Sequence, residues 1–338
     1  MKSYFIYTNH PDLMQSRKPF FKNLQNDFEA KNRYASNPED ADILVINSYE
    51  CVDQILKRKR KNPSQLFIHQ VNAPEKSYKK IIGWRDDIVR FINCNVADAT
   101  VFQSQWSQKE NQHLLISCTP LSTIIPKAPD PLIFNTRQRT TLTSARKPRL
   151  IANNWSNHWR KGFETLQFLD EHLNFDKYDM TFVGKSPLKF NNIRHIQPVD
   201  SLEMASWLKQ SDIYILAAPK NEACAEVLLE ALHCGVPVIA VNATSNSEFI
   251  GKGGELFDDM SEIPKTIRKV LKKYTVYQKS IQNPRLSEIG DRYYQFMQLC
   301  EQEHKDKRKH LSRLQFLYLR CILLAWRIFG TIEDMRQT

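Results

Sequence analysis

The sequence contains little glycine and lacks the motifs in which glycine usually serves nucleotide binding. Only 9 of its 338 residues are glycine, and neither GxGxxG nor GxxxxGK[ST] is present. These glycine-rich loops cradle the phosphates of dinucleotides and of P-loop nucleotides, so both of these site types are disfavoured.

Paired cysteines and a long N-terminal apolar run are also missing. The seven cysteines are odd in number, scattered, and form no CxxC pair. This pattern disfavours a zinc site and predicts free thiols in a reducing compartment. The apolar run at residues 4–7 is too short for a signal peptide. We therefore expect a cytoplasmic protein.

The formal net charge of +11 is concentrated in three places. The stretches 57–61 and 137–149 contribute +5 each, and 305–327 contributes +6. Such clusters fit a nucleic acid, an anionic membrane surface or a polyphosphate substrate. Aromatic residues are not interleaved with them, as stacking on a nucleic acid would favour, so no nucleic-acid partner is expected.

Short apolar runs alternate with helical patterns in two series, on either side of a polar, basic stretch without periodicity. Alternation of this kind predicts an α/β protein with two doubly wound parallel sheets and a ligand cleft between their carboxyl ends. We expect one Rossmann-like domain at 1–135, a linker at 136–148 and a second Rossmann-like domain at 149–283.

Residues 221–240 form the most informative segment. A helix is predicted from about residue 225 to Gly235, and Glu230 lies in it among apolar neighbours. A buried carboxylate is costly unless it is paired or hydrogen-bonded. Glu222 lies just before the helix, where free backbone N–H groups attract anions. A nucleotide-sugar, with its hydroxyls and phosphates, would satisfy all these groups; the alternative is a surface helix with solvated glutamates.

This segment resembles a known family. Glu222-x7-Glu230 with the following residues 231–240 is similar to the EX7E region of retaining glycosyltransferases of the GT-B fold, family 4. The resemblance covers about residues 67–257, and four further segments agree in order: 69–74 with Arg85 and Asp86, 97–107, 153–163, and 211–215. It implies an acceptor-side domain at 1–135, a donor-binding domain at 149–283 and a crossing helix at 284–303. The composition of residues 304–338 predicts a basic amphipathic extension after them.

The resemblance also implies roles for individual residues. Glu222 would contact the donor sugar hydroxyls and Glu230 the ribose hydroxyls. Lys161 would hold the diphosphate and neutralise the leaving group, and Glu222, Lys161 and His69 are the candidate catalytic residues. The full set of candidate donor-binding residues is Asn154, Arg160, Lys161, Gly184, Glu222, Ala223, Cys224, Ala225 and Glu230.

Some positions depart from the family pattern. Trp155 stands near where the family has an arginine, and Arg160 is the candidate to replace it. Cys224-Ala225 replaces the usual Phe-Gly, and residues 8–11 lack the glycines of the first loop. His69 fits either a substrate contact or a strand-end histidine satisfied within the fold. Gly184 fits either close approach to the nucleotide or a simple turn.

The C-terminal extension is almost wholly apolar over Leu314–Phe329, with Arg313, Arg320 and Arg327 seven residues apart. These 16 residues fall short of the ~20 that span a bilayer. They fit a helix lying in a membrane interface through 305–329, or one packed on the enzyme or on a partner. The basic run 57–61 fits either a solvated helix end or contact with an acidic acceptor or membrane.

Together these features predict a retaining, metal-independent glycosyltransferase without a cofactor. It would move a sugar from a UDP- or GDP-sugar to a saccharide or lipid-linked acceptor in cell-surface glycan synthesis, at the cytoplasmic face of the membrane. No DxD motif lies in a suitable place for a metal. The alternatives are a GT-B-like nucleotide-sugar isomerase, and a catalytically inactive Rossmann pair that binds nucleic acid or membrane.

Overall fold

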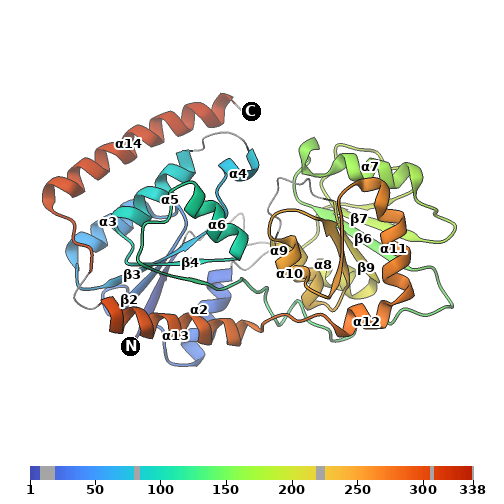
Figure 1. Ribbon diagram of the computed structural model, residues 1–338, viewed down its shortest axis with the longest axis horizontal. Helices are drawn as coiled ribbons and strands as arrows, with labels where there is room; N and C mark the ends of the chain where they lie inside the picture. The colour runs from blue at the N-terminus through green and yellow to red at the C-terminus, as the bar shows by residue number, and fades with distance from the viewer. Residues whose placement is uncertain (8–19, 80–83, 218–224, 305–307, 337–338) are drawn as a thin grey trace. The chain divides into compact units, whose positions relative to one another are not determined.

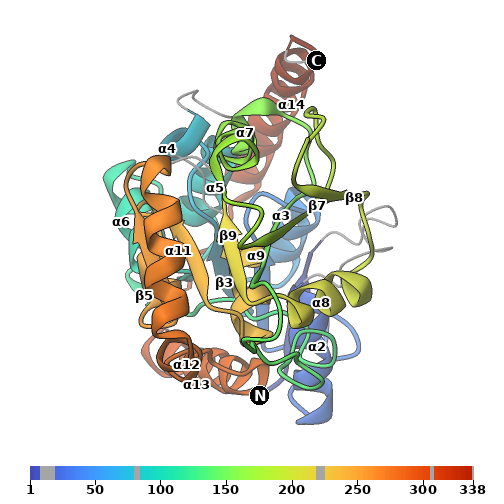
Figure 2. The same cartoon turned by 90° about the vertical axis from the view of Figure 1, so that its right-hand side faces the viewer.

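The computed structural model describes residues 1–7, 20–79, 84–217, 225–304 and 308–336, which form two compact units (Figures 1 and 2). Unit 1 contains the first strand, Phe21–Pro126 and Ser287–Thr338, and unit 2 contains Lys127–Leu286. Each unit is built on a parallel β-sheet flanked by helices. The predicted pair of Rossmann-like α/β domains is therefore confirmed.

Unit 1 contains five parallel strands in the spatial order β1-β2-β3-β4-β5. They are β1 (Ser3–Ile6), β2 (Ile43–Asn47), β3 (Leu66–Val71), β4 (Ala99–Phe102) and β5 (Leu121–Ile124). β2, β3 and β4 are almost entirely buried, which explains why their sequences are continuous apolar runs instead of alternating patterns.

Helices cover both faces of this sheet. α3 (Val52–Lys61) and α5 (Trp84–Asn95) pack on the face that Ile6 and Leu44 present. Phe5 points to the other face, where its ring meets those of Phe21 and Phe28. The remaining helices of the unit are α2 (Phe20–Ala30), α4 (Lys76–Lys79), α6 (Gln105–His113), α13 (Leu286–His304) and α14 (Arg313–Arg336).

A single bridge outside the named strands explains how unit 1 is doubly wound. Ser3 pairs in parallel with Ile43 of β2 on one side and with Tyr34 on the other. The chain thus leaves β1, returns through α2 to Tyr34 on the outer side of β1, and then crosses to β2. Winding reverses between β1 and β2, and such a switch point opens a crevice at the carboxyl ends of the strands.

Unit 2 has its own switch point. Its six parallel strands lie in the order β11-β10-β9-β6-β7-β8, so winding reverses between β6 and β9. The strands are β6 (Arg149–Asn154), β7 (Asp179–Gly184), β8 (Arg194–Ile196), β9 (Ile213–Leu216), β10 (Val238–Val241) and β11 (Gly254–Phe257). This is the strand order of dinucleotide-binding folds, in which ligands bind at the carboxyl ends beside the reversal.

The helices of unit 2 cover both faces of its sheet, and two apolar clusters fill the space between them. Following β6 is the short 3₁₀ helix η1 (Trp159–Lys161), and α9 (Ala225–His233) connects β9 to β10. The others are α7 (Phe163–His172), α8 (Ser201–Gln210), α10 (Asn246–Ile250), η2 (Met260–Glu262), α11 (Ile263–Lys272) and α12 (Tyr274–Lys279).

The basic stretch around residues 137–149 is bound to unit 2. Arg146 donates to both oxygens of the fully buried Asp212, at 2.6 and 2.9 Å. Lys147 donates to the carbonyl of Phe175, and Arg139 to the carbonyl of Cys234. The predicted linker 136–148 contains no helix or strand, but much of its charge is used inside the unit.

The basic run 57–61 is also more than a solvated helix end. Lys59 is fully buried and pairs with the fully buried Asp98 at 2.8 Å. The Asp98 carboxylate also accepts hydrogen bonds from the backbone N–H of Phe67, at 2.9 Å, and of Lys309, at 2.9 Å. One carboxylate thus joins α3, β3, the approach to β4 and the segment before α14.

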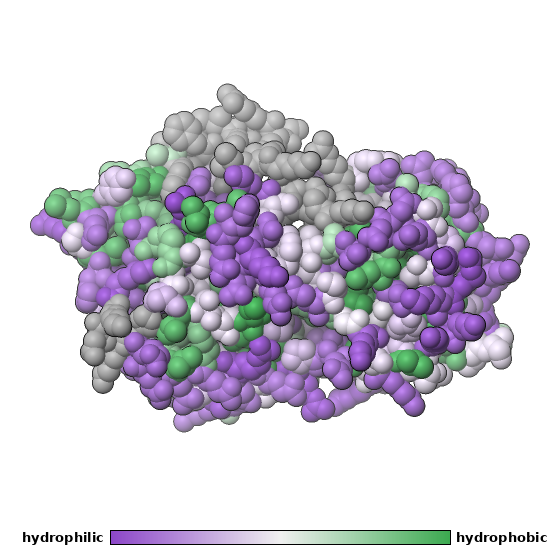
Figure 3. Space-filling model, in the orientation of Figure 1, coloured by the Kyte–Doolittle hydropathy of each residue, from purple (hydrophilic) through white to green (hydrophobic). Residues whose placement is uncertain are grey.

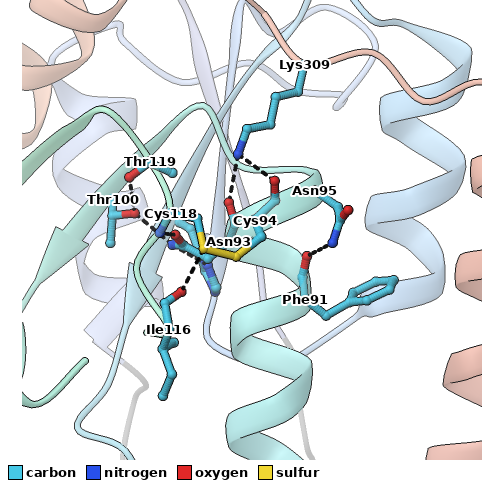
Figure 4. Close-up of a disulfide and its surroundings, with 10 residues drawn as sticks. Phe91, Asn93, Cys94, Asn95, Thr100, Ile116, Cys118, Thr119 and Lys309 are labelled. Atoms are coloured by element: carbon cyan, nitrogen blue, oxygen red, sulfur yellow. Dashed lines mark hydrogen bonds between the residues drawn. A yellow bond between two sulfur atoms is a disulfide. The ribbon is translucent and has the colours of Figure 1, made fainter. Parts of the chain in front are cut away.

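The prediction of free thiols is wrong for two of the cysteines. Cys94, in the last turn of α5, forms a disulfide with Cys118 (Figure 4). The side chain of Asn93 accepts a hydrogen bond from the Cys118 backbone N–H at 2.8 Å, which holds the two segments together. Sequence spacing could not reveal this pair, because the fold brings residues 24 positions apart within 4.8 Å between Cα atoms.

The C-terminal extension packs on unit 1 along one side of α14. Phe316, Leu319 and Leu323 are buried against the apolar cluster of α3 and α5, and the Arg60 guanidinium lies 4.8 Å from the centre of the Phe316 ring. The alternative of a helix packed on the enzyme therefore holds for this side. Among the residues that the structure describes, no helix is both long and apolar enough to cross a bilayer.

The pair of Lys59 and Asp98 predicts a strong coupling. We expect Lys59→Met to lower the free energy of unfolding by about 3–5 kcal/mol, because it leaves a buried carboxylate without its cation. The double variant Lys59→Met/Asp98→Asn should recover part of this loss, since no buried charge remains. Urea denaturation of the single and double variants measures the coupling, and strictly additive losses would contradict it.

Candidate functional site

Asn154 shapes the loop that follows β6. Its side-chain oxygen accepts a hydrogen bond from the backbone N–H of Ser156 at 3.0 Å, and its amide donates to the carbonyl of Lys161 at 2.8 Å. These two bonds fold residues 155–161 back over the end of β6 and place Lys161 at the end of η1, half-buried. Two predicted donor-binding residues are thus directly connected.

Gly184 is required by the neighbouring strand. It ends β7 directly opposite Asn154, and its φ is +132°. A Cβ atom at this position would lie 1.8 Å from the Asn154 carbonyl oxygen, which also accepts the backbone N–H of Lys185. Neither of the two explanations predicted for Gly184 included this close approach between strands. The glycine allows the loops after β6 and β7 to leave the sheet side by side.

Two polar side chains at the same edge of the sheet were missed from the sequence. Asn153, at the end of β6, accepts a hydrogen bond from the buried Tyr214 hydroxyl at 2.7 Å, and its amide nitrogen is buried without a partner. Thr244 follows β10, and its hydroxyl is likewise buried and without a partner. The sequence signal for both was their position just after an apolar strand.

The two glutamates of α9 lie in different surroundings. Glu230 is buried, with 5% of its surface exposed, among the apolar residues that sequence placed around it. Glu226, one turn earlier, has an exposed side chain and pairs with Lys127 at 3.0 Å. The alternative of a surface helix with solvated glutamates holds for Glu226 and is wrong for Glu230.

Several predicted site residues lie outside the described part of the chain. Glu222, Ala223 and Cys224 fall in 218–224, the segment that joins β9 to α9. Ala225 is the first residue of α9, and Arg160 lies in η1; the side chains of these two residues are not described. The expectations for all five therefore stay predictions. Within unit 2, Asn154, Lys161 and Gly184 come together at the carboxyl edge.

His69 lies in β3 of unit 1 and is fully buried. Its Nε2 is 2.8 Å from the carbonyl oxygen of Ser48, and its Nδ1 is 3.3 Å from the side-chain amide of Asn93. Burial lowers its pKa from 6.5 to about 4, so the ring is neutral at physiological pH. This geometry matches the strand-end histidine satisfied within the fold and disfavours a direct contact between His69 and a substrate.

A small hollow of about 130 Å³ lies at the carboxyl edge of the unit 1 sheet. Arg85 pairs there with Glu75 at 3.1 Å. The Asp86 carboxylate accepts the backbone N–H groups of Glu75 and Lys76, and burial raises its pKa. Residues 72–75, Arg85 and Asp86 thus line one polar hollow at the ends of β2 and β3. Across the described residues, no group of three His, Cys, Asp or Glu side chains is placed to hold a metal ion.

The close approach at Gly184 predicts a severe effect of a single methyl group. We expect Gly184→Ala to lower the free energy of unfolding by about 3 kcal/mol or more, because strands β6 and β7 must move apart. Gly251→Ala is the matched control: φ there is +50°, but nothing lies within 4 Å of the added Cβ. It should cost about 1–3 kcal/mol of backbone strain, without a steric clash. Thermal unfolding compares the two, and equal losses would refute the steric explanation.

The depressed pKa of His69 predicts a pH dependence of stability. Between pH 6.5 and about 4 the unfolded chain binds a proton at this residue that the folded chain does not. Stability should therefore fall as pH drops through this window, by about 1.4 kcal/mol per pH unit from this group. His69→Gln should remove that part of the slope, whereas His113→Gln, at an exposed position of α6, should not. Urea titrations at several pH values test this, and an unchanged slope in His69→Gln would argue against it.

Comparisons with known proteins agree with the resemblance. Residues 188–286 match the family model described as Glycosyl transferases group 1. A stretch of 86 residues is 34% identical to a phosphatidyl-myo-inositol mannosyltransferase of Propionibacterium freudenreichii subsp. shermanii. That stretch is 25% of this chain and 23% of the mannosyltransferase, so the chain spans about a quarter of the length of this relative.

Solved structures share the fold over most of the chain. A glycosyltransferase from Rickettsia africae has a TM-score of 0.58 at 15% identity, covering 88% of this chain and 85% of its own. Anabaena HepE, in complex with UDP and glucose, has a TM-score of 0.59 at 13% identity, covering 81% and 80%. The stretch 188–286, which contains β9, α9 and the buried Glu230, thus matches a glycosyl transferases group 1 model, in agreement with the resemblance.

Proposed function

We propose that this chain is a glycosyltransferase that moves a sugar from a nucleotide-sugar donor to a saccharide or lipid-linked acceptor. The observation that carries the proposal is the burial of Glu230 on α9, the helix that follows β9 at the switch point of a glycosyl transferases group 1 domain. A buried carboxylate can accept two hydrogen bonds from neighbouring hydroxyl groups. The two ribose hydroxyls of a nucleotide have this arrangement.

The loop after β6 provides the second element of the proposed donor site. A nucleoside diphosphate gains negative charge as it leaves the sugar, and fixed cations and helix N-termini lower the energy of that state. Lys161 is the proposed cation, because Asn154 fixes its backbone at the carboxyl edge of the sheet. The N-terminus of α9, with the backbone N–H groups of residues 223–225, is the proposed second source of positive potential.

The finer features of the proposal rest on the resemblance. They are a UDP or GDP donor, Glu222 as the contact to the donor sugar, retention of configuration, no metal requirement, and a role in cell-surface glycan synthesis at the inner face of the membrane. HepE, which shares the fold, was solved with UDP and glucose. We assign no nucleophile and no general base.

The first test compares the two glutamates of α9. Glu230→Gln should raise the Kd for the donor about 10- to 100-fold, because a charge-assisted hydrogen bond becomes a neutral one. Glu226→Gln, one turn away and exposed, should change the Kd less than 2-fold. Isothermal titration with UDP- and GDP-sugars measures both. If wild-type protein binds no member of a nucleotide-sugar panel, the proposal fails.

Product analysis separates the remaining alternatives. Release of nucleoside diphosphate that depends on an acceptor supports transfer, and a rearranged nucleotide-sugar formed without acceptor supports the isomerase. Lys59 and Arg146 pair with buried aspartates, so these two cations of the basic clusters stabilise the fold. Steep salt-dependent binding to RNA or DNA would support a nucleic-acid-binding role instead.

A further inference from the structure

The apolar residues of α14 form two separate stripes, and only one of them is buried. Phe316, Leu319 and Leu323 face unit 1 and are at most 6% exposed. The packing of this inner stripe on α3 and α5 fixes which side of the helix faces outward. The sequence showed one wide apolar face, and the structure divides that face in two.

The outer stripe is exposed. Leu314, Leu317, Tyr318 and Leu324 are 80%, 49%, 65% and 55% exposed, and Cys321 between them is also exposed. Their spacing of three, four, seven and ten residues places them along one side of the helix. In Figure 3 hydrophobic residues reach the surface at the upper left, where the coloured part of α14 lies, with hydrophilic residues among them. A contiguous exposed apolar surface of this kind marks an interaction site.

The charges beside the stripe favour an anionic occupant. Arg313 and Arg320 are exposed on α14, and Arg60 of α3 lies against the ring of Phe316. From Arg308 to Ile332 the sequence has five lysines and arginines and no acidic residue. The same stretch of a second copy would offer these arginines no carboxylate, whereas a bilayer with anionic lipids offers both an apolar layer and negative charge.

We propose that the outer stripe of α14 binds the surface of an anionic lipid membrane, with the helix lying in the plane of the interface. The leucines enter the boundary of the acyl chains, and Tyr318, Arg313 and Arg320 lie at the level of the headgroups. The inner stripe stays packed on unit 1, so attachment needs no unfolding of the extension. This deepens the proposed location at the membrane, and it does not depend on which donor is bound.

The test is co-flotation of the full chain with vesicles of phosphatidylcholine, with and without about 30% phosphatidylglycerol. Wild-type protein should float with the anionic vesicles and much less with the neutral ones. Leu317→Gln/Leu324→Gln should lower the partition coefficient at least about 10-fold. Arg313→Gln/Arg320→Gln should lower it about 10- to 30-fold and weaken its dependence on salt.

Matched variants on unit 2 serve as controls. Leu202→Gln removes an exposed leucine of α8, and Lys265→Gln/Arg268→Gln removes two exposed charges of α11. Both should float like wild type, and circular dichroism with nucleotide-sugar titration shows that every variant remains folded. Equal binding to neutral and anionic vesicles, or no binding to either, would overturn the proposal. So would dimerisation in analytical ultracentrifugation that Leu317→Gln/Leu324→Gln abolishes, because the stripe would then belong to a second copy.

Discussion

The carboxylate of Asp98 is the interaction on which unit 1 most depends. It binds Lys59 of α3, the backbone of β3 at Phe67 and the backbone of Lys309. The side chains of Asp98 and Lys59 are both fully buried. The ammonium of Lys309 also donates to the carbonyls of Asn93 and Cys94 at the end of α5 (Figure 4). The segment before α14 is therefore fixed by polar bonds, and the helix itself is held by the packing of Phe316, Leu319 and Leu323 on unit 1.

Unit 2 also contains a buried aspartate that joins neighbouring strands. Asp212 comes immediately before β9, as Asp98 comes immediately before β4, and it is also fully buried. It accepts the backbone N–H of Arg149, the first residue of β6, and both nitrogens of Arg146. Each aspartate thus joins its strand to the neighbouring strand at the amino edge of the sheet. The carboxyl edge, where ligands bind in doubly wound folds, is left to the loops.

Features that depend on the local sequence pattern could be predicted, whereas contacts between residues far apart in the sequence could not. The apolar neighbours of Glu230 predicted its burial, and alternation predicted both sheets. The sequence did not predict that Lys59 pairs with Asp98 or that Arg146 pairs with Asp212. An isolated aspartate gives no indication of its partner. The sequence did not predict the disulfide of Cys94 and Cys118 or the steric role of Gly184 for the same reason. Each depends on a segment that only the fold brings close.

The basic residues behind the net charge of +11 have different roles in the structure. Lys59 and Arg146 neutralise buried carboxylates, and Arg58 pairs with Glu39, so these three cations stabilise the units. Arg313 and Arg320 stay exposed beside an apolar stripe in a stretch without acidic residues. The proposed attraction to an anionic surface therefore acts where a helix already packed on unit 1 also supplies the apolar contact. Through its inner stripe α14 packs on unit 1, and through its outer stripe it exposes apolar residues for the proposed membrane contact.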